Sequence, residues 1–398
     1  MSIIILCRYP SQFLNFKDWF KNCDENIFLF VNKKYEKDYK KLNFATVVGF
    51  KNYDYDASIE LEAIKLSKEN KITNIFAFEE RDILRAGRLR DFLHIKGQDY
   101  QSSLAYRNKL VMKTILSTNG ITVPAFSKAD TIYDILRFIE VHGYPILIKP
   151  VDKYAAIDTR KIENWNELVD YCSEINIENM MVEEFIDSDM GSCNGMVIDN
   201  KIEFVASTIY LLPRLQFNRY LVAITLPPHD HRAKKMEVYC REVIKTLPPM
   251  QTSVFHSELF LSENSIKLCE IASRIPGGGI TDAIKYSYNI DLNEQWAKII
   301  VNKNYSFPHV KFNKYSASII VPKRKGKIKR IAASLPYDWV ENYFLSVKEG
   351  DIIEDSQKNG DKVALIIITS DTYPEIIDRI TQITNYFEKH LIIEKPEN

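Results

Sequence analysis

The sequence predicts an α/β domain of the doubly wound type at the N-terminal end, continued by α+β structure. From the start to about Glu80, short apolar runs alternate with amphipathic stretches, which is typical of a parallel sheet with crossover helices. Further along, short buried strands, helices and one strand hairpin follow one another. A chain of 398 residues with 45% hydrophobic content is long enough to bury two or three connected cores.

The N-terminal region is expected to hold four buried strands followed by a helix from Arg81 to His94, whose apolar residues form one broad face. Ligands of open parallel sheets bind beyond the carboxyl ends of the strands. The region has no GxGxxG phosphate motif, so we expect a scaffold that forms one wall of a substrate site. The predicted strands are Ile3 to Cys7, Ile27 to Val31, Ala45 to Phe50 and Asn74 to Phe78.

The middle of the chain begins with a predicted helix from Ser103 to Thr118, which ends at a C-cap signal, Asn119-Gly120. A short buried strand then ends at Lys149-Pro150, because proline cannot continue the ladder. Another such strand is predicted from Met180 to Ile186. The last part carries two more strands, Tyr315 to Val321 and Val363 to Thr369, and a final amphipathic helix, Pro374 to His390.

One hairpin carries the strongest chemical signal. A turn centred on Asn264 places Glu258 directly opposite Glu270, on the same face of the two strands. Two opposed carboxylates repel unless they are protonated or bridged by a cation, and an oxygen-binding cation such as Mg²⁺ fits them. His256 is expected on the face of Glu258, and Arg274 on that of Glu270. An ordinary surface hairpin with solvated carboxylates is the alternative.

Three consecutive glycines, Gly277 to Gly279, follow this hairpin. Clustered glycines let the backbone approach a ligand closely and expose N–H groups to anionic oxygens. A flexible loop would have the same composition, so the run alone does not identify a site.

The composition excludes several classes of protein. Lys plus Arg and Asp plus Glu number 53 each, so no net field attracts nucleic acid or an anionic membrane. The apolar N-terminus is too short for a membrane span or a signal segment. Six cysteines without a CxxC pair argue against a zinc site or a disulfide framework, and a reducing cytoplasm is the expected location.

The order of these residues resembles the ATP-grasp superfamily, particularly its carboxylate-amine ligases and L-amino-acid ligases. The resemblance covers nearly the whole chain, including the lead-in Phe78-Glu-Glu-Arg and Arg107-Asn-Lys-Leu-Val-Met-Lys. It rests on order and spacing together, since no single motif is decisive. The residues that carry it are Lys109, Lys149, the strand end Glu183-Glu184-Phe185-Ile186, Glu258, Glu270 and Arg274.

The resemblance implies a role for each residue. Lys109 and Lys149 would contact the phosphates of ATP, although either lysine taken alone reads as a solvated side chain. The strand end Glu183 to Ile186 would read adenine, largely through backbone groups. Glu258 and Glu270 would hold one or two Mg²⁺ ions, with Mn²⁺ as the other candidate cation. Arg274 would stabilise charge on the transferred phosphoryl group, and the loop from Gly277 would meet the acyl group.

The resemblance also implies three regions: an N-terminal pre-ATP-grasp α/β domain (1–102), an ATP-grasp region that binds nucleotide and metal (103–306), and a C-terminal α+β segment (307–398). The implied reaction joins a small-molecule carboxylate, activated as an acyl phosphate, to an amine, with release of ADP and phosphate. Amino acids are the expected substrates. Capture of the acyl group by the thiol of an acyl carrier protein is one alternative, and a non-catalytic nucleotide-binding module is another. Assembly as a homodimer is left open.

The sequence departs from the family pattern at three places. The segment after Pro150, Val151 to Thr159, has no glycine, whereas relatives carry a glycine-rich loop over the phosphates. Met190 stands where relatives carry a ribose-binding glutamate, with Asp189 beside it. Ala272 replaces the asparagine of the usual Glu-x-Asn on the metal strand.

Other charged residues remain candidates. Arg214 and Arg219 lie between the adenine strand and the hairpin, and either would suit a substrate carboxylate or simply a solvated loop. His256 is a candidate contact for the acceptor substrate, with a structural histidine as the alternative. His229-Asp230-His231 reads as a helix-start turn. The basic run Lys323 to Arg330 reads as a solvated hairpin turn, with acidic-partner docking or nucleic-acid binding as the minor interpretations.

Overall fold

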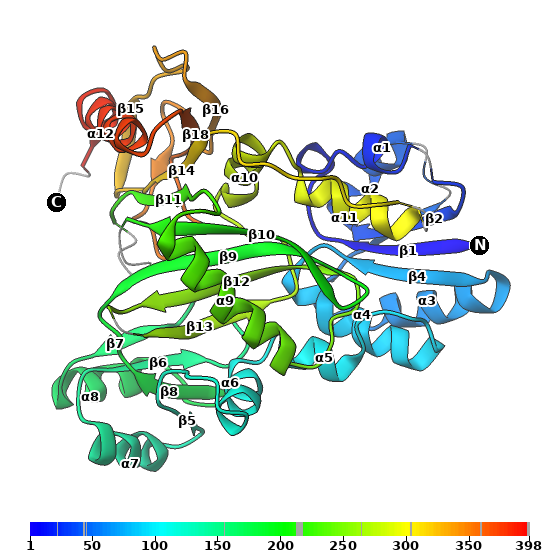
Figure 1. Ribbon diagram of the computed structural model, residues 1–398, viewed down its shortest axis with the longest axis horizontal. Coiled ribbons are helices and arrows are strands. Elements are labelled where there is room, and N and C mark those ends of the chain that lie inside the picture. Colours follow the sequence, from blue (N-terminus) through cyan, green and yellow to red (C-terminus); the bar gives the residue numbers. More distant parts are fainter. Residues whose placement is uncertain are drawn as a thin grey trace.

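The computed structural model arranges the chain around one large antiparallel sheet, with a parallel domain on one side and a smaller sheet below it (Figure 1). The structure describes residues 1–21, 23–42, 44, 46–154, 156–211, 218–263, 265–302, 305–358 and 360–395. The turn residue Asn264 and the candidate Arg214 lie outside the described residues.

The N-terminal part is a parallel sheet in the order β3-β2-β1-β4, as predicted. The central strand β1 is buried along its whole length, which explains its continuous apolar run. The carboxyl ends of β1 and β4 lie side by side, so the residues that follow them share one edge of the sheet. The elements are β1 (Ser2–Cys7), β2 (Asn26–Asn32), β3 (Thr46–Phe50), β4 (Ile72–Ala77), α1 (Phe16–Trp19), α2 (Glu36–Tyr39), α3 (Ser58–Glu69) and α4 (Glu80–Leu93).

The single helix predicted from Ser103 to Thr118 is wrong: the segment forms two helices, α5 (Tyr100–Ala105) and α6 (Lys109–Thr118). The break lies at Asn108, whose backbone is extended and whose side chain accepts hydrogen bonds from the N–H groups of Leu110 and Val111. Asparagine is a strong N-cap residue, and here it starts a new helix inside an otherwise helical pattern. The new start places Lys109 in the first turn of α6.

The large sheet has the order β13-β12-β9-β10-β11-β14-β18-β16 and is antiparallel throughout. Helices α9 and α10 contribute to different core clusters on it, one of which contains Met236 of α9 and the other Ile280 of α10. Strand β14 pairs with β11, so the predicted boundary after residue 306 crosses a continuous sheet. The elements are β9 (Asp189–Ile198), β10 (Lys201–Tyr210), β11 (Leu221–Thr225), β12 (Ser253–Leu261), β13 (Ile266–Ala272), β14 (Tyr315–Val321), β16 (Val340–Leu345), β18 (Ala364–Ser370), α9 (His231–Thr246), α10 (Ile280–Tyr288), α11 (Leu292–Val301) and α12 (Tyr373–His390).

A second antiparallel sheet, in the order β5-β8-β6-β7, lies below the first with α7 and α8 beneath it (Figure 1). A small third sheet, β17-β15-β19, includes most of the basic run, so the predicted hairpin turn is wrong: the run forms β15, which pairs with β17 and β19 and belongs to a different sheet from β14. Asp230 caps α9, as the helix-start interpretation of His229 to His231 predicts. The elements are β5 (Phe126–Ala129), β6 (Ile146–Pro150), β7 (Arg160–Ile162), β8 (Met180–Glu184), β15 (Gly326–Arg330), β17 (Ile352–Ile353), β19 (Ile392–Glu394), α7 (Ile132–His142) and α8 (Trp165–Glu174).

Aromatic packing attaches the N-terminal domain to the large sheet. Trp296 of α11 is 4% exposed, and its ring centroid lies 4.3 Å from that of Phe76 and 5.7 Å from that of Phe78. Aromatic pairs of this geometry contribute about 0.5–1.5 kcal/mol each beyond the area they bury. This contact holds the end of β4 close to α11, which belongs to the segment that follows the β12–β13 hairpin. In the described part of the chain, no helix is long and apolar enough to cross a membrane.

Candidate active site

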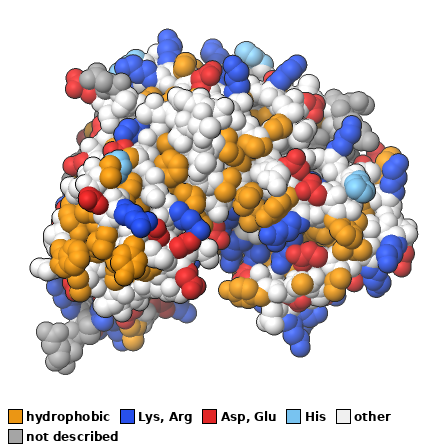
Figure 2. All heavy atoms as spheres, turned by 90° about the horizontal axis from the view of Figure 1, so that it is seen from below, with side chains coloured by type: hydrophobic (Ala, Val, Ile, Leu, Met, Phe, Trp, Pro, Cys, Tyr) orange, Lys and Arg blue, Asp and Glu red, His pale blue; other side chains and the backbone are white. Residues whose placement is uncertain are grey.

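A cleft of about 960 Å³ opens between the two antiparallel sheets and the N-terminal domain. Seen from below, the surface is hollowed between two lobes, and basic and acidic side chains gather in the hollow (Figure 2). Most of the predicted site residues line this one cleft although they are far apart in the sequence. They are Lys109, Lys149, Glu184, Phe185, Ile186, His256, Glu258, Glu270, Arg274 and Gly277.

The carboxylate pair of the hairpin has the predicted register, with Glu258 opposite Glu270. The register shifts between Glu258 and Leu259, which pairs with Leu268, so Cys269 is an extra residue on β13. Lys109 Nζ lies 2.9 Å from Glu270 Oε2, and the Tyr210 hydroxyl donates to Glu258 Oε1 at 3.1 Å. Both glutamates face the cleft with a cation or a donor beside each.

These two carboxylates fit a Mg²⁺ ion, because Mg²⁺ is commonly held by one or two carboxylates together with substrate phosphates. Among the described residues, no group of three or more His, Cys, Asp or Glu side chains gathers to bind a metal without other ligands. A cation at Glu258 and Glu270 would therefore take further oxygen ligands from a bound nucleotide or from water. When bound there, Mg²⁺ would neutralise phosphate charge next to the two glutamates.

His256 lies two residues before Glu258 on β12 and is 5% exposed. Its Nδ1 is 2.6 Å from Asn194 Oδ1, while the Asn194 amide donates to Ser192 Oγ at 3.0 Å. This chain of contacts leaves Nε2 on the side of Glu258, 3.8 Å from Oε1. Burial lowers the pKa of His256, and Arg274 acts in the same direction, while Glu258 opposes both. The contact with Asn194 fixes the orientation of the ring, in keeping with a wall of the site.

The glycine-free segment from Val151 to Thr159 covers the cleft beside Lys109. The Lys109 N–H donates to Val151 O at 2.8 Å, and Lys109 Nζ donates to Lys153 O at 2.5 Å. Ala156 and Asp158 adopt φ values of 57° and 55°, a region that non-glycine residues enter at a cost of about 1–2 kcal/mol each. The segment therefore makes a tight loop of the kind that glycine usually permits. It lines the cleft through Lys153, Tyr154, Ala156 and Thr159.

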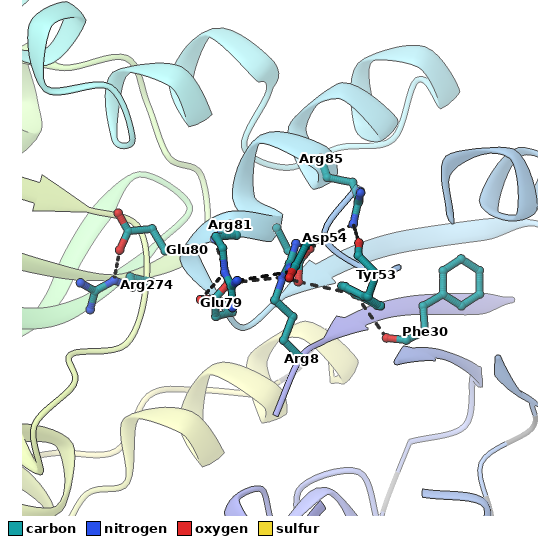
Figure 3. Close-up of polar contacts among 10 residues, drawn as sticks. Arg8, Phe30, Tyr53, Asp54, Glu79, Glu80, Arg81, Arg85 and Arg274 are labelled. Atoms are coloured by element: carbon teal, nitrogen blue, oxygen red, sulfur yellow. Dashed lines mark hydrogen bonds and ion pairs between the residues drawn. The ribbon is translucent and has the colours of Figure 1, made fainter. Parts of the chain in front are cut away.

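Arg274 faces the cleft just beyond the end of β13, held by the N-terminal domain. Its Nε donates to Glu80 Oε2 at 2.6 Å, its Nη1 donates to Ile275 O at 2.9 Å, and Arg107 Nη1 donates to Glu80 Oε1 at 3.0 Å. Figure 3 shows the Arg274–Glu80 contact reaching from the large sheet to the start of α4. Burial by itself raises the pKa of Glu80, but the two arginines outweigh it and the net shift is downward. In the described part of the chain, Nη2 of Arg274 has no protein partner, so it is available to an anionic oxygen.

A second charged network holds Glu79, the N-cap of α4, at the edge of the cleft (Figure 3). The Arg81 N–H donates to Glu79 Oε2 at 2.9 Å, and Arg8 Nε lies 3.4 Å from the same oxygen. Arg8 is itself fixed by the fully buried Asp82, with Nη2 2.9 Å from Oδ1. The guanidinium of Arg81 also lies 5.8 Å from the ring of Tyr154 in the covering loop. The N-terminal domain thus contributes charged side chains to the cleft in addition to a wall.

The glycine run forms the turn that leads into α10. Gly278 and Gly279 have φ values of 66° and 78°, and a Cβ on Gly279 would lie 2.7 Å from Leu365 Cδ1. The conformation at position 279 therefore favours glycine, and a larger residue would also have to displace the Leu365 side chain. Gly277 has no atom within 4 Å of a Cβ position, and it opens into the cleft. Asp282, in the first turn of α10, also lines the cleft.

Two predicted site residues lie outside the cleft. The Glu183 side chain is buried between Lys149 and Lys113 and does not reach the cleft, because alternation along β8 turns it away from the side of Glu184. Arg219, two residues before β11, is exposed and does not line the cleft. Asp189, noted beside the Met190 substitution, is exposed and away from the cleft, whereas Asp187 lines it.

Sequence reasoning missed several lining residues. Tyr9 and Glu79 follow β1 and β4, and the rule that ligands sit beyond the carboxyl ends of parallel strands was a signal for both. Asp282 carried a weaker signal, its place directly after the glycine run. Ile320 and Gly360, from the C-terminal segment, carried none that we can identify.

No family model matches the chain. The L-arginine-specific L-amino acid ligase of Bacillus subtilis is 25% identical over 350 residues, which cover 84% of this chain and 83% of that protein.

Solved structures show the same fold. The L-amino acid ligase of Bacillus licheniformis has a TM-score of 0.81 at 16% identity, over 99% of both chains. The biotin carboxylase domain of the Hydrogenobacter thermophilus 2-oxoglutarate carboxylase, solved with MgADP and bicarbonate, has a TM-score of 0.70 at 14% identity, over 99% of this chain and 90% of that one. The chain therefore has the fold of these ATP-grasp structures and is similar in sequence, along most of its length, to an L-amino acid ligase.

Proposed function

We propose that the protein joins an amino acid carboxylate to an amine in an ATP-dependent reaction that passes through an acyl phosphate and releases ADP and phosphate. The observation that carries the proposal is the meeting of three cationic side chains with a pair of opposed carboxylates in one cleft. Lys109, Lys149 and Arg274 suit a polyphosphate and a developing oxyanion, while Glu258 and Glu270 suit Mg²⁺.

The proposed reaction needs little covalent chemistry from the protein. A carboxylate oxygen of the substrate attacks the γ-phosphorus of ATP, and the bond from that phosphorus to ADP breaks. The nitrogen of the amine then attacks the acyl carbon, the bond to phosphate breaks, and the proton of the amine leaves with the phosphate. Catalysis by positioning and electrostatics fits a site built from Lys, Arg and Glu.

Each group has a defined task in this proposal. Lys109 and Lys149 hold the phosphates of ATP. Arg274, oriented by Glu80, offers Nη2 to the transferred phosphoryl group and to the oxyanion of the tetrahedral intermediate. The backbone at Gly277 to Gly279 meets the acyl group, and the covering loop with Tyr154 excludes water from it. His256 forms a wall beside the acceptor.

The carboxylates that line the cleft favour a basic amino acid over other amino acids as the substrate. Glu79 and Glu80 line the cleft but are paired with arginines. Asp282 is half-buried and, among the described residues, has no hydrogen bond or ion pair with the protein. Such a carboxylate is suited to a cationic group of a ligand. This agrees with the L-arginine specificity in the name of the Bacillus subtilis relative, and L-arginine is the first substrate to test.

The test is nucleotide release from ATP and Mg²⁺ with amino acids supplied singly and in pairs, starting from L-arginine. ADP and phosphate formed only with a particular pair, and lost in a Glu270→Gln variant, would support the ligase. Formation of AMP would contradict the acyl-phosphate route. Nucleotide binding without turnover by any pair would favour the carrier-protein thiol as acceptor, or a non-catalytic module. Mn²⁺ is included because a site of two carboxylates also suits that ion.

The location and assembly of the protein are part of the same proposal. All six cysteines are free thiols, which supports a reducing compartment such as the cytoplasm. A homodimer is testable by light scattering of the purified protein. A mass of one chain, 46.3 kDa, would contradict it.

A further inference from the structure

A buried ionic triad lies behind the nucleotide side of the cleft. It consists of Lys113 on α6, Glu183 on β8 and Lys149 at the end of β6. Lys113 Nζ is 3.0 Å from Glu183 Oε2, and Lys149 Nζ contacts Glu183 Oε1. The three side chains are 0%, 1% and 4% exposed, respectively. Only Lys149 reaches the cleft.

The charges of the triad do not cancel. Lys149 and Glu183 alone would form a neutral pair, and a neutral pair attracts a phosphate only weakly. Lys113 occupies the second oxygen of the same carboxylate, so the three groups together carry one net positive charge. Lys149 is then anchored in position without losing the charge that it presents to the cleft.

The pKa shifts of Lys149 and Glu183 favour their ionised forms, whereas that of Lys113 does not. Burial lowers the pKa of Lys113, and although Glu183 opposes that shift, the net shift is downward. Burial lowers the pKa of Lys149 as well, but Glu183 outweighs it and the net shift is upward. Burial raises the pKa of Glu183, yet the two lysines outweigh it and the net shift is downward.

Lys113 also contacts β13, the strand that carries Glu270. Its Nζ donates to Leu268 O at 3.0 Å, where the register of β13 shifts next to the carboxylate pair. The fully buried ammonium group of Lys113 therefore contacts both Glu183, which pairs with Lys149, and the strand that carries Glu270. Lys113 is the last residue of the lead-in Arg107-Asn-Lys-Leu-Val-Met-Lys and follows Lys109 by one helical turn, but the family resemblance assigned it no role.

Stability alone does not account for this arrangement. A buried ion pair or triad replaced by apolar side chains of similar volume is often as stable as before or more stable. A lysine removed completely from water is thus poorly explained as a stabilising group. The position of Lys113 is better explained by its effect, through Glu183, on the position and charge of Lys149.

We propose that Lys113 is a positioning residue for nucleotide binding. By pairing with Glu183 it keeps Lys149 fixed and leaves the triad with one net positive charge for the phosphates of ATP. The proposal rests on the proposed function only in assigning the phosphates to the side of Lys149. It concerns binding of nucleotide and is independent of which carboxylate or amine reacts.

The experiment compares the affinity for MgADP, measured by isothermal titration calorimetry, in four proteins: wild type, Lys113→Met, Glu183→Gln and the double variant. Lys113→Met makes the triad neutral, and we expect MgADP binding to weaken about 10- to 30-fold, as expected for loss of a unit charge at several ångströms and intermediate dielectric. The double variant removes one charge of each sign and restores the net positive charge. We expect it to bind MgADP within about threefold of wild type. The single Glu183→Gln variant completes the double-mutant cycle.

Two outcomes would overturn the proposal: unchanged affinity in Lys113→Met, or a double variant that binds no better than Lys113→Met. Thermal unfolding of each protein is measured alongside, because a merely structural role predicts that affinity follows stability and not net charge. Lys113→Gln serves if Lys113→Met does not fold, since glutamine can still donate to Leu268 O but carries no charge. The same weakening is expected from it, and wild-type affinity would again reject the idea. Failure of the ligase assay with intact MgADP binding would count only against the proposed function.

Discussion

Replacement of Arg274 by alanine tests the chemistry proposed for the cleft. The guanidinium is the group that we assign to charge on the transferred phosphoryl oxygens and on the tetrahedral oxyanion. Removal of a donor to such an oxyanion in other enzymes lowers turnover about 10²- to 10³-fold, or about 2.7–4 kcal/mol in the activation free energy. We expect a loss of kcat of that size for Arg274→Ala.

The same substitution has a cost in stability that can be estimated from the structure. Arg274 Nε donates to Glu80 Oε2 at 2.6 Å, and the two side chains are 17% and 7% exposed, so water screens the contact weakly. A hydrogen bond to a charged group contributes about 1.5–3 kcal/mol. Glu80 keeps its contact with Arg107 at 3.0 Å, so we expect the free energy of unfolding to fall by no more than this amount.

Arg107 provides the matched control. It donates to the other oxygen of Glu80, is 8% exposed, and does not line the cleft. Arg107→Ala should therefore cost a similar free energy of unfolding, about 1.5–3 kcal/mol, while kcat stays within a few-fold of wild type. Steady-state ADP release and urea unfolding measure the two quantities. Equal losses of kcat in the two variants would refute the reasoning, because they would show that Arg274 acts only through the fold.

Three further perturbations have defined outcomes. Gly279→Ala should lower the free energy of unfolding by about 2–4 kcal/mol, since φ is 78° and its Cβ would meet Leu365 at 2.7 Å, whereas Gly277→Ala should change it by less than about 0.5 kcal/mol in the same urea titration. Chelation of Mg²⁺ by EDTA should leave the unfolding midpoint of the nucleotide-free protein unchanged and abolish ADP release; a lowered midpoint would instead indicate a structural metal. Because the folded-state pKa of Glu183 is lowered, its contribution to stability is present above the unfolded value of 4.5 and is lost as the pH falls through the folded value. Urea unfolding from neutral pH to about pH 3.5 should therefore show a steeper decline for wild type than for Glu183→Gln, and parallel curves would contradict the assignment.

Local patterns predicted the parts of the site that depend on strand alternation. Glu258 lies opposite Glu270 as predicted, but the pairing depends on the bulge at Cys269, because nearer the turn Leu261 pairs with Ile266, one residue off the predicted register. The parallel N-terminal sheet was equally predictable, because its buried strands are continuous apolar runs. The break before Lys109 was not predicted, since a single capping asparagine interrupts a pattern that stays helical in its apolar spacing.

The sequence offered no guidance where the backbone and the side chain of one residue have different roles. Glu183 belongs to the strand end that the family resemblance assigns to adenine, but its carboxylate turns to the opposite face and joins Lys113 and Lys149. The predicted role concerned backbone groups and gave no information about that side chain. Arg219 is a different case. Its guanidinium has the chemistry needed to bind a carboxylate, but the residue lies exposed at the surface.

The sequence by itself determined the class of the fold, the existence of the hairpin and the identity of the charged residues, because hydrophobic periodicity and turn chemistry act within a few residues of each other. Only the tertiary structure decided which of these residues meet. Glu80 and Arg274 are 194 positions apart and form one contact, Lys113 is buried against the metal strand, and β14 continues the sheet across the boundary predicted after residue 306. Such contacts depend on how whole elements pack, and no local pattern in the chain records the distance between them.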